Sequence, residues 1–133
     1  MKCFFVFLLV FLTLLTACDP FRRINMKNRS GHDADITWFI KMDSINHSYF
    51  FISSAQEVKF ELKPQKPSNE IYMSFGVGTW TPKAVQNLVD DLDSLVIRWN
   101  KGVIRIKGEE EIKKFLLPRR KGFAKDKIEI QIN

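Results

Sequence analysis

Period-two alternation of apolar and polar residues is the feature that most constrains the fold of this chain. It runs from residue 57 to 63 and again from 127 to 133. The apolar positions are Val58, Phe60, Leu62, Ile128, Ile130 and Ile132. Successive side chains of a strand point to opposite faces, so this spacing gives each strand one apolar face. We therefore expect half-buried β-strands, with one face in a core and the other in solvent.

Six further segments are rich in β-branched and aromatic residues or alternate in the same way. They span residues 24–29, 35–42, 48–53, 71–75, 94–99 and 103–107. The last two are joined by Asn100-Lys101-Gly102, which is typical of a hairpin. Eight short strands predict a mainly β fold, namely an antiparallel β-sandwich or an open barrel with one or two short helices.

The helices are expected between the later strands. Thr81 followed by Pro82 is a typical helix start, and apolar residues then recur at helical spacing, which predicts a helix from Pro82 to Leu92. Residues 109–116 begin with three glutamates and continue with two lysines, an order that suits the helix macrodipole. We expect a second short helix there, followed by a basic loop over residues 118–127.

The first seventeen residues differ from the rest of the chain. Lys2 precedes an apolar run from Cys3 to Ala17, which is the organisation of a secretory signal peptide. As a helix this run would span about 22 Å, short of the ~30 Å hydrocarbon core of a membrane. Pro20 follows shortly and has no amide hydrogen with which to continue a helix. A signal peptide is therefore favoured over a membrane-spanning helix.

The end of this segment, Leu15-Thr16-Ala17-Cys18, resembles the lipobox of bacterial lipoproteins. The resemblance implies cleavage before Cys18, a thioether-linked diacylglycerol on its sulfur and an acyl chain such as palmitate on its amino group. Two or more acyl chains give stable membrane anchoring. The implied division is a cleaved signal peptide over residues 1–17, a lipidated N-terminus and tether over 18–23, and a single β-rich domain over 24–133.

The same resemblance leaves no free thiol in the mature chain. Cys3 leaves with the signal peptide, and a lipidated Cys18 cannot form a disulfide. We therefore expect a fold without disulfides, cysteine metal ligands or thiol catalysis. Removing 17 of the 133 residues leaves 116, enough for one domain with its own core.

The whole chain also looks like the small lipoproteins of Bacteroidota, to which no activity is assigned. The lipobox, residues 28–31 and the segment from Phe75 to Pro82 carry this likeness, which implies a place in the bacterial cell envelope. In enterobacterial lipoproteins, an aspartate such as Asp19 directly after the cysteine favours inner-membrane retention. No acidic cluster of the kind associated with surface export follows it. We expect a periplasm-facing anchor rather than a surface-exposed one.

The mature chain is basic, which bears on its partners. Loss of Lys2 lowers the net charge from +6 to +5, so anionic lipid head groups beside the anchor would attract the domain. An envelope protein is a further expected partner, whereas nucleic acid is excluded by the compartment. The basic stretch near the C-terminus is the expected lipid contact, and the alternative is a solvated loop. Its residues are Arg119, Arg120, Lys121, Lys125 and Lys127, with Phe123 among them.

Two short segments have the chemistry of ligand sites. His32, Asp33 and Asp35, with the distant His47, are zinc-ligand types, but zinc needs three or four ligands at a defined geometry and we expect a solvated turn. Gly76-Val77-Gly78 before a helix resembles a phosphate-binding loop.

That glycine segment departs from the dinucleotide fingerprint, because Thr81 stands where the fingerprint has glycine. We expect the two glycines to turn a strand into a helix, with Trp80 half exposed as the one contact residue.

Two acidic patterns complete the set. Asp90, Asp91 and Asp93 crowd the end of the first predicted helix, where a calcium contact competes with a solvated end or with lysine pairing. The triplets beginning Asp43-Ser44 and Asp93-Ser94 resemble the O-glycosylation motif of exported Bacteroidota proteins.

The sequence assigns neither a catalytic residue, nor a metal, nor a cofactor, and Cys18 is its one assigned modification site. We therefore expect a lipid-anchored envelope protein that acts as a binding or structural module. The alternatives are a small envelope hydrolase and an inhibitor or immunity-like protein.

Overall fold

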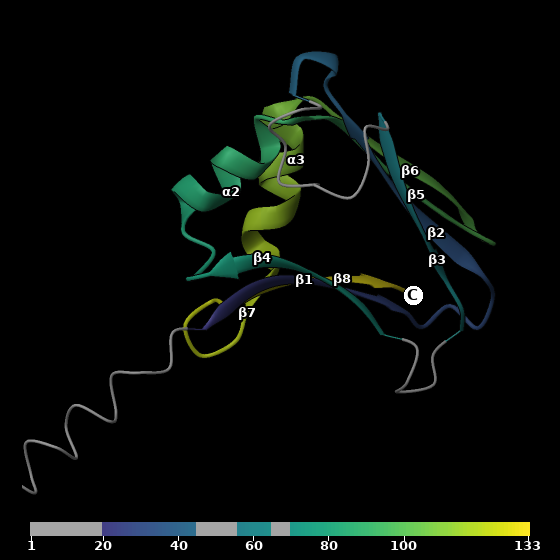
Figure 1. Ribbon diagram of the computed structural model, residues 1–133. Coiled ribbons are helices and arrows are strands. Elements are labelled where there is room, and N and C mark those ends of the chain that lie inside the picture. Colours follow the sequence, from purple (N-terminus) through teal and green to yellow (C-terminus); the bar gives the residue numbers. More distant parts are fainter. Residues whose placement is uncertain (1–19, 45–55, 65–69) are drawn as a thin grey trace, which may run out of the picture.

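The computed structural model describes residues 20–44, 56–64 and 70–133, and these form two packed sheets with helices along one side (Figure 1). Sheet A has the strand order β4 (Ile71–Val77), β1 (Phe21–Asn28), β8 (Lys127–Ile132) and β7 (Arg120–Lys121). Sheet B has the order β3 (Glu57–Leu62), β2 (Ala34–Ile40), β5 (Leu92–Trp99) and β6 (Gly102–Lys107). The predicted mainly β sandwich is confirmed.

The sheets differ in strand direction. Sheet B is antiparallel throughout, and its β5–β6 hairpin is the one predicted from Asn100-Lys101-Gly102. In sheet A, β1 is antiparallel to β4 but parallel to β8. The sandwich is therefore not purely antiparallel, because the first and last strands of the fold run side by side in the same direction.

Over the described ranges, two helices and two single 3₁₀ turns connect the strands. They are α2 (Pro82–Val89), α3 (Glu109–Leu116), η1 (Met42–Ser44) and η3 (Leu117–Arg119). The Thr81 side chain caps α2 by accepting a hydrogen bond from the Ala84 amide at 3.1 Å. Figure 1 shows α2 and α3 packed where the two sheets are farthest apart. Within the described residues, no helix combines the length and hydrophobicity needed to cross a bilayer.

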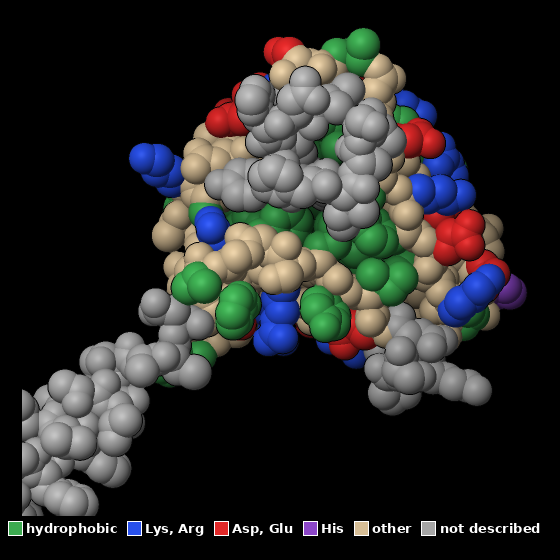
Figure 2. Space-filling view, in the orientation of Figure 1, with side chains coloured by type: hydrophobic (Ala, Val, Ile, Leu, Met, Phe, Trp, Pro, Cys, Tyr) green, Lys and Arg blue, Asp and Glu red, His purple; other side chains and the backbone are tan. Residues whose placement is uncertain are grey.

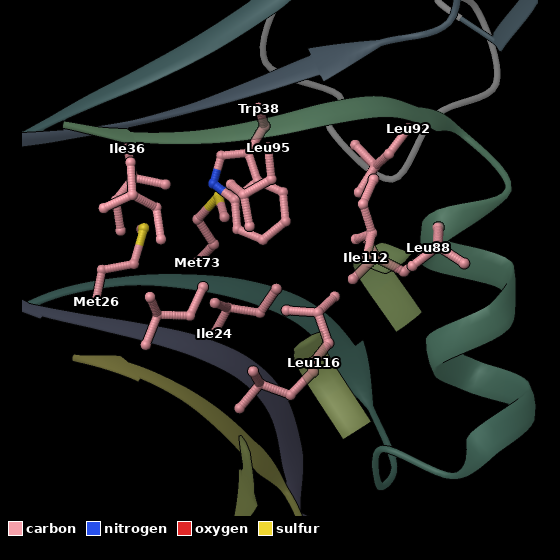
Figure 3. Packing of buried hydrophobic residues seen from close by; sticks show 14 of the residues in the cluster. Ile24, Met26, Ile36, Trp38, Met73, Leu88, Leu92, Leu95, Ile112 and Leu116 are labelled. Atoms are coloured by element: carbon pink, nitrogen blue, oxygen red, sulfur yellow. The ribbon is translucent and has the colours of Figure 1, made fainter. Parts of the chain in front are cut away.

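The core lies between the sheets and the helices. Both sheets send alternate residues inward, and Ile24 and Ile36 are fully buried. Leu88 of α2 and Ile112 of α3 close the same core from the side, as Figure 3 shows. The opposite residues of β1, such as Lys27, face outward. Period-two alternation thus places one face of each central strand in the core, as predicted.

Several predicted boundaries are wrong. Strand β1 begins at Phe21, which pairs with Val77, so the strand includes three residues of the predicted tether. Helix α2 ends at Val89, because Leu92 already starts β5. Part of the predicted basic loop 118–127 is ordered as η3 and β7. The predicted strand over residues 48–53 lies outside the described residues.

Candidate membrane-facing end

The described chain begins at one end of sheet A. The Pro20 carbonyl accepts a hydrogen bond from the Gly78 amide at 2.7 Å, which ties the entering chain to the end of β4. The next residue, Phe21, lies opposite Val77 in the strand register. Both side chains are more than half exposed, at 62% and 51%. The chain therefore enters the fold beside two exposed hydrophobic side chains from neighbouring strands.

The loop between β7 and β8 lies at the same end and is held at its base. The Arg23 amide donates to the Asp126 carbonyl at 3.0 Å, and the Trp80 amide donates to the Lys125 carbonyl at 2.8 Å. Gly122 has a φ of +89°, which residues with a side chain rarely adopt, and a Cβ there would displace the Asp126 carboxylate, so the position favours glycine. These contacts fix the loop against β1 and the start of α2.

Phe123 stands at the tip of this held loop and is fully exposed. A shallow hollow between the loop and the chain entry is lined by Pro20 and Arg23 on one side and by Phe123 and Ala124 on the other. The exposed aromatic ring is therefore a neighbour of the point where the N-terminal segment joins the fold.

Basic side chains form a row across the strands beside this loop. Arg23 of β1 pairs in register with Lys127 of β8, and Lys127 pairs with Lys121 of β7. Residues in register share a face of a sheet, so the three cations lie on the outer face of sheet A. Figure 2 shows hydrophobic and basic side chains next to one another along the lower edge of the molecule, near the chain entry.

We name this region the entry surface. It consists of the exposed hydrophobic residues Phe21, Val77 and Phe123 and the basic residues Arg23, Lys121, Lys125 and Lys127. Among the basic members, Arg23 is the one that the sequence does not predict, because it lies in the predicted tether and only the pairing of β1 with β8 brings it beside Lys127. The exposure of Phe21 and Val77 is likewise visible only in the structure. Among the described residues, Asp126 lies 3.6 Å from Arg23, and Glu129 lies close enough to Lys121 and Lys127 for their charges to help lower its pKa.

Two residues of the predicted lipid contact have structural roles instead. Arg119 donates to the Phe115 carbonyl at 2.6 Å and its guanidinium lies 3.6 Å from the centre of the Phe115 ring. Burial lowers the pKa of Arg119 below its ordinary value. Arg120 donates to the carbonyls of Leu117 and Trp80 at 2.9 and 3.0 Å. Arg119 thus closes the end of α3, and Arg120 ties that end to Trp80. Lys121, Lys125 and Lys127 remain as the members of the predicted lipid contact without such a role.

The predicted half-exposed position of Trp80 is wrong, because its side chain is 2% exposed. Its indole N–H donates to the Arg23 carbonyl at 3.0 Å, and its ring packs edge-on against Phe75 at 5.3 Å. Gly76 and Gly78 have positive φ angles of +79° and +120°, as a turn between strand and helix requires. That turn directs Trp80 back into the core rather than toward solvent.

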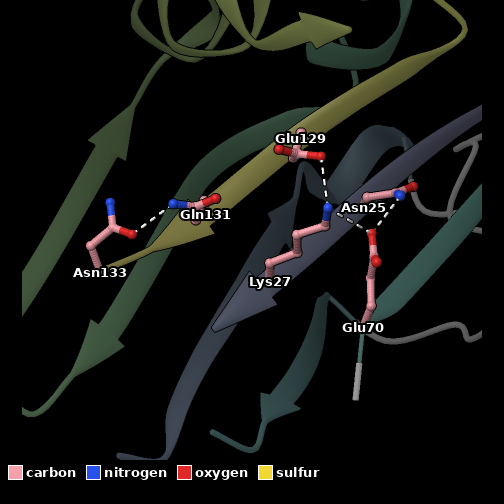
Figure 4. Close-up of polar contacts among 6 residues, drawn as sticks. All are labelled: Asn25, Lys27, Glu70, Glu129, Gln131 and Asn133. Carbon is pink, nitrogen blue, oxygen red and sulfur yellow. Dashed lines mark hydrogen bonds and ion pairs between the residues drawn. The ribbon is translucent and has the colours of Figure 1, made fainter. Parts of the chain in front are cut away.

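A second polar cluster lies on the outer face of sheet A, as Figure 4 shows. The Lys27 ammonium contacts Glu129 at 2.9 Å and Glu70 at 3.4 Å, and the Asn25 amide donates to Glu70 at 2.7 Å. The hydrogen bond between the pair lowers the pKa of Glu129 and raises that of Lys27. Each group therefore holds the other in its charged form, which suits a structural link between strands rather than proton transfer.

The two aspartates of the candidate zinc site are engaged in ion pairs. Asp35 contacts Arg98 at 3.2 Å and Lys59 at 4.0 Å, and Asp33 contacts Lys63 at 2.6 Å. Figure 2 shows basic and acidic side chains interspersed on the right of the molecule. Over the described ranges, no three His, Cys, Asp or Glu side chains are grouped to hold a metal. His47 lies outside those ranges.

The three aspartates near α2 occupy different places. Asp90 caps the end of the helix and accepts from the Gln86 side chain at 2.6 Å, whereas Asp93 already belongs to β5. Ser94 is 3% exposed, so the Asp93-Ser94 triplet offers no accessible hydroxyl for a glycan in the folded domain. The other triplet extends from Asp43-Ser44 into residue 45, outside the described residues.

Comparison with known proteins found no match of any kind. No family model matched the chain, and neither the curated proteins nor the solved structures contained one similar to it.

Proposed function

We propose that this protein is a lipid-anchored, periplasm-facing component of a bacterial cell envelope, held by acyl chains on Cys18 and acting as a binding or structural module. The lipobox-like segment Leu15-Thr16-Ala17-Cys18 is the observation that carries the proposal, and the position of Pro20 is compatible with it. The described fold begins only two residues after Cys18. Two extended residues span at most about 7 Å, so a lipid on Cys18 would hold the membrane surface close to the entry surface.

The charged clusters of the domain support a module rather than an enzyme. The Lys27–Glu129, Arg98–Asp35 and Lys63–Asp33 pairs each satisfy an acid with a base from another strand or loop. Catalytic acids and bases need a pKa near the working pH and a free position toward a substrate. Carboxylates engaged in this way favour a role in holding the strands together.

The lipid on Cys18 is tested by expressing the full chain with a radiolabelled fatty acid and measuring the intact mass of the membrane-extracted protein. We expect label incorporation and the mass of a chain that begins at residue 18 and carries a diacylglycerol and one acyl chain. The Cys18→Ala variant should lose the label completely. The matched Cys3→Ala variant should keep it, because Cys3 is removed with the signal peptide.

A membrane-extracted protein with an unmodified Cys18 would contradict the proposal. Equal labelling of the Cys18→Ala and wild-type chains would contradict it as well.

A further inference from the structure

We propose that the entry surface docks onto the anionic bilayer itself, with Phe123 inserted among the lipid head groups, so that the domain is held in one orientation. This inference rests on the proposed lipid anchor at Cys18. It goes further, because an anchor alone would let the domain turn freely about its tether.

The presentation of Phe123 is the first argument. The ring is fully exposed on a loop whose base is fixed by hydrogen bonds to Arg23 and Trp80. The described fold provides no apolar surface that covers the ring, so its exposure does not serve the core. Exposed Phe21 and Val77 lie at the same end of sheet A. An exposed hydrophobic group with basic residues around it is the pattern of a membrane-interaction site.

Charge is the second argument. Within the described residues, Lys121, Lys125 and Lys127 form no ion pair, whereas Lys27, Lys41 and Lys63 do. Lys125, together with Lys121 and Lys127 beside Glu129, is therefore available to phosphate groups of anionic lipids, whereas Arg23 already pairs with Asp126 at 3.6 Å. Attraction of this kind acts within about one Debye length, ~8–10 Å at physiological salt. The short tether between Cys18 and Pro20 keeps the basic row within such a distance of the surface.

The short tether also indicates which partner binds the entry surface. An acidic protein could satisfy the same cations, but Pro20 lines the hollow beside Phe123 and only Asp19 separates it from Cys18 in the sequence. The bilayer would then already occupy the space that a protein partner needs. A lipid surface is therefore the occupant that the geometry favours.

The experiment uses Ala124→Cys, which keeps Phe123 and places the one free thiol of the processed lipoprotein at the loop tip. The thiol carries an environment-sensitive fluorophore, and the lipidated protein is reconstituted into vesicles of phosphatidylethanolamine and phosphatidylglycerol. We expect a blue-shifted emission and strong quenching by lipids with a nitroxide near the head group. The Val103→Cys control carries the dye on β6, an exposed position on the other sheet, and should remain unquenched.

Two further variants separate the hydrophobic and the charged contributions. Adding Phe123→Ala to Ala124→Cys should reduce quenching several-fold. Adding Lys121→Gln and Lys125→Gln should do the same, and replacing phosphatidylglycerol with phosphatidylcholine should reproduce that loss. The matched pair Lys101→Gln and Arg105→Gln, both exposed at the β5–β6 hairpin and on β6, should leave the signal unchanged.

The two proposals fail in different ways. If the processed chain carries no lipid on Cys18, both the anchor and the docking proposals are wrong. If the chain is lipidated and reconstituted but the dye on the loop remains in water, the lipid anchor is supported. The docking of the entry surface on the bilayer is then contradicted. Equal quenching with and without anionic lipid overturns the role of the basic side chains.

Discussion

Trp80 and Phe123 show that burial, and not residue type, decides what an aromatic side chain does in this fold. Trp80 lies in the core and links three segments, because its indole bonds the Arg23 carbonyl while its own backbone bonds Lys125 and Arg120. Phe123, in contrast, is fully exposed to solvent. The Trp80 amide donates to the Lys125 carbonyl, so the buried residue stabilises the loop that presents the exposed one.

This difference predicts opposite outcomes for two alanine substitutions. Trp80→Ala removes a buried aromatic ring and should lower the free energy of unfolding by about 3–5 kcal/mol. Phe123→Ala changes an exposed side chain and should alter it by about 0.5 kcal/mol or less. Chemical denaturation followed by circular dichroism measures both. A loss of similar size in the two variants would show that Phe123 is part of the core.

At the scale of the element, β1 is the strand on which sheet A depends. It lies between β4 and β8, and its outward residues make the cross-strand contacts. Lys27 is joined to Glu129 of β8 and to Glu70 directly before β4. Its ammonium therefore connects three neighbouring segments on the outer face while Ile24 and Met26 connect them in the core.

The Lys27–Glu129 pair predicts a pH dependence of stability. Because the folded state lowers the pKa of Glu129 below its ordinary value of 4.5, its stabilising contribution is present above pH 4.5. That contribution is lost as the pH falls through the lowered pKa. In Glu129→Gln, the free energy of unfolding should therefore fall less steeply between about pH 5 and pH 2 than in the wild type.

Urea denaturation across that pH range measures the slope. Glu57→Gln, on an exposed position of β3, is the matched control and should keep the wild-type slope. An unchanged slope in Glu129→Gln would show that the ion pair contributes nothing to stability. At neutral pH the expected cost of Glu129→Gln is small, about 0.2–1 kcal/mol, because the pair is partly exposed to solvent.

At the scale of the whole molecule, the two ends of the described chain meet in the middle of sheet A. Strand β1 begins the fold and β8 ends it, yet they pair in parallel over residues 23–28 and 127–132. Closing this pair costs chain entropy, because the loop between the two strands spans almost the whole domain. Sheet A therefore depends on β8, which lies between β1 and β7.

A C-terminal truncation tests this dependence. A chain that ends at Asp126 lacks β8 and exposes the inner faces of β1 and the helices, so it should not unfold cooperatively on heating. A chain shortened by Asn133 alone loses only an exposed end residue and should behave as the wild type. Differential scanning calorimetry distinguishes the two. A cooperative transition in the longer truncation would show that β8 is dispensable.

The predictable part of the fold is the part that depends on local spacing. The alternation at Val58, Phe60 and Leu62 correctly indicates which side of β3 faces the core, and Thr81-Pro82 correctly marks the start of α2. The end of α2 was harder to predict, because Leu92 suits an apolar helix stripe and a buried strand equally well. The packing of Leu92 in β5 decides between them.

The candidate site was only partly predictable for the same reason. The basic stretch around Phe123 is visible in the sequence, but its members have different roles in the fold. Arg119 and Arg120 bond backbone carbonyls of the α3 end, which requires α3 to turn back over Trp80. Arg23 joins the entry surface from the opposite end of the chain. Contacts between residues this far apart leave no local pattern to read.

The sequence by itself determined the faces of the strands, the starts of the helices and the lipobox-like segment before the fold, because each depends on residues within a few positions of one another. The tertiary structure alone decided that β1 and β8 pair in parallel, that Trp80 is buried and that Phe123 lies beside the chain entry. These features depend on residues up to about a hundred positions apart, brought together when the two sheets bury their apolar faces.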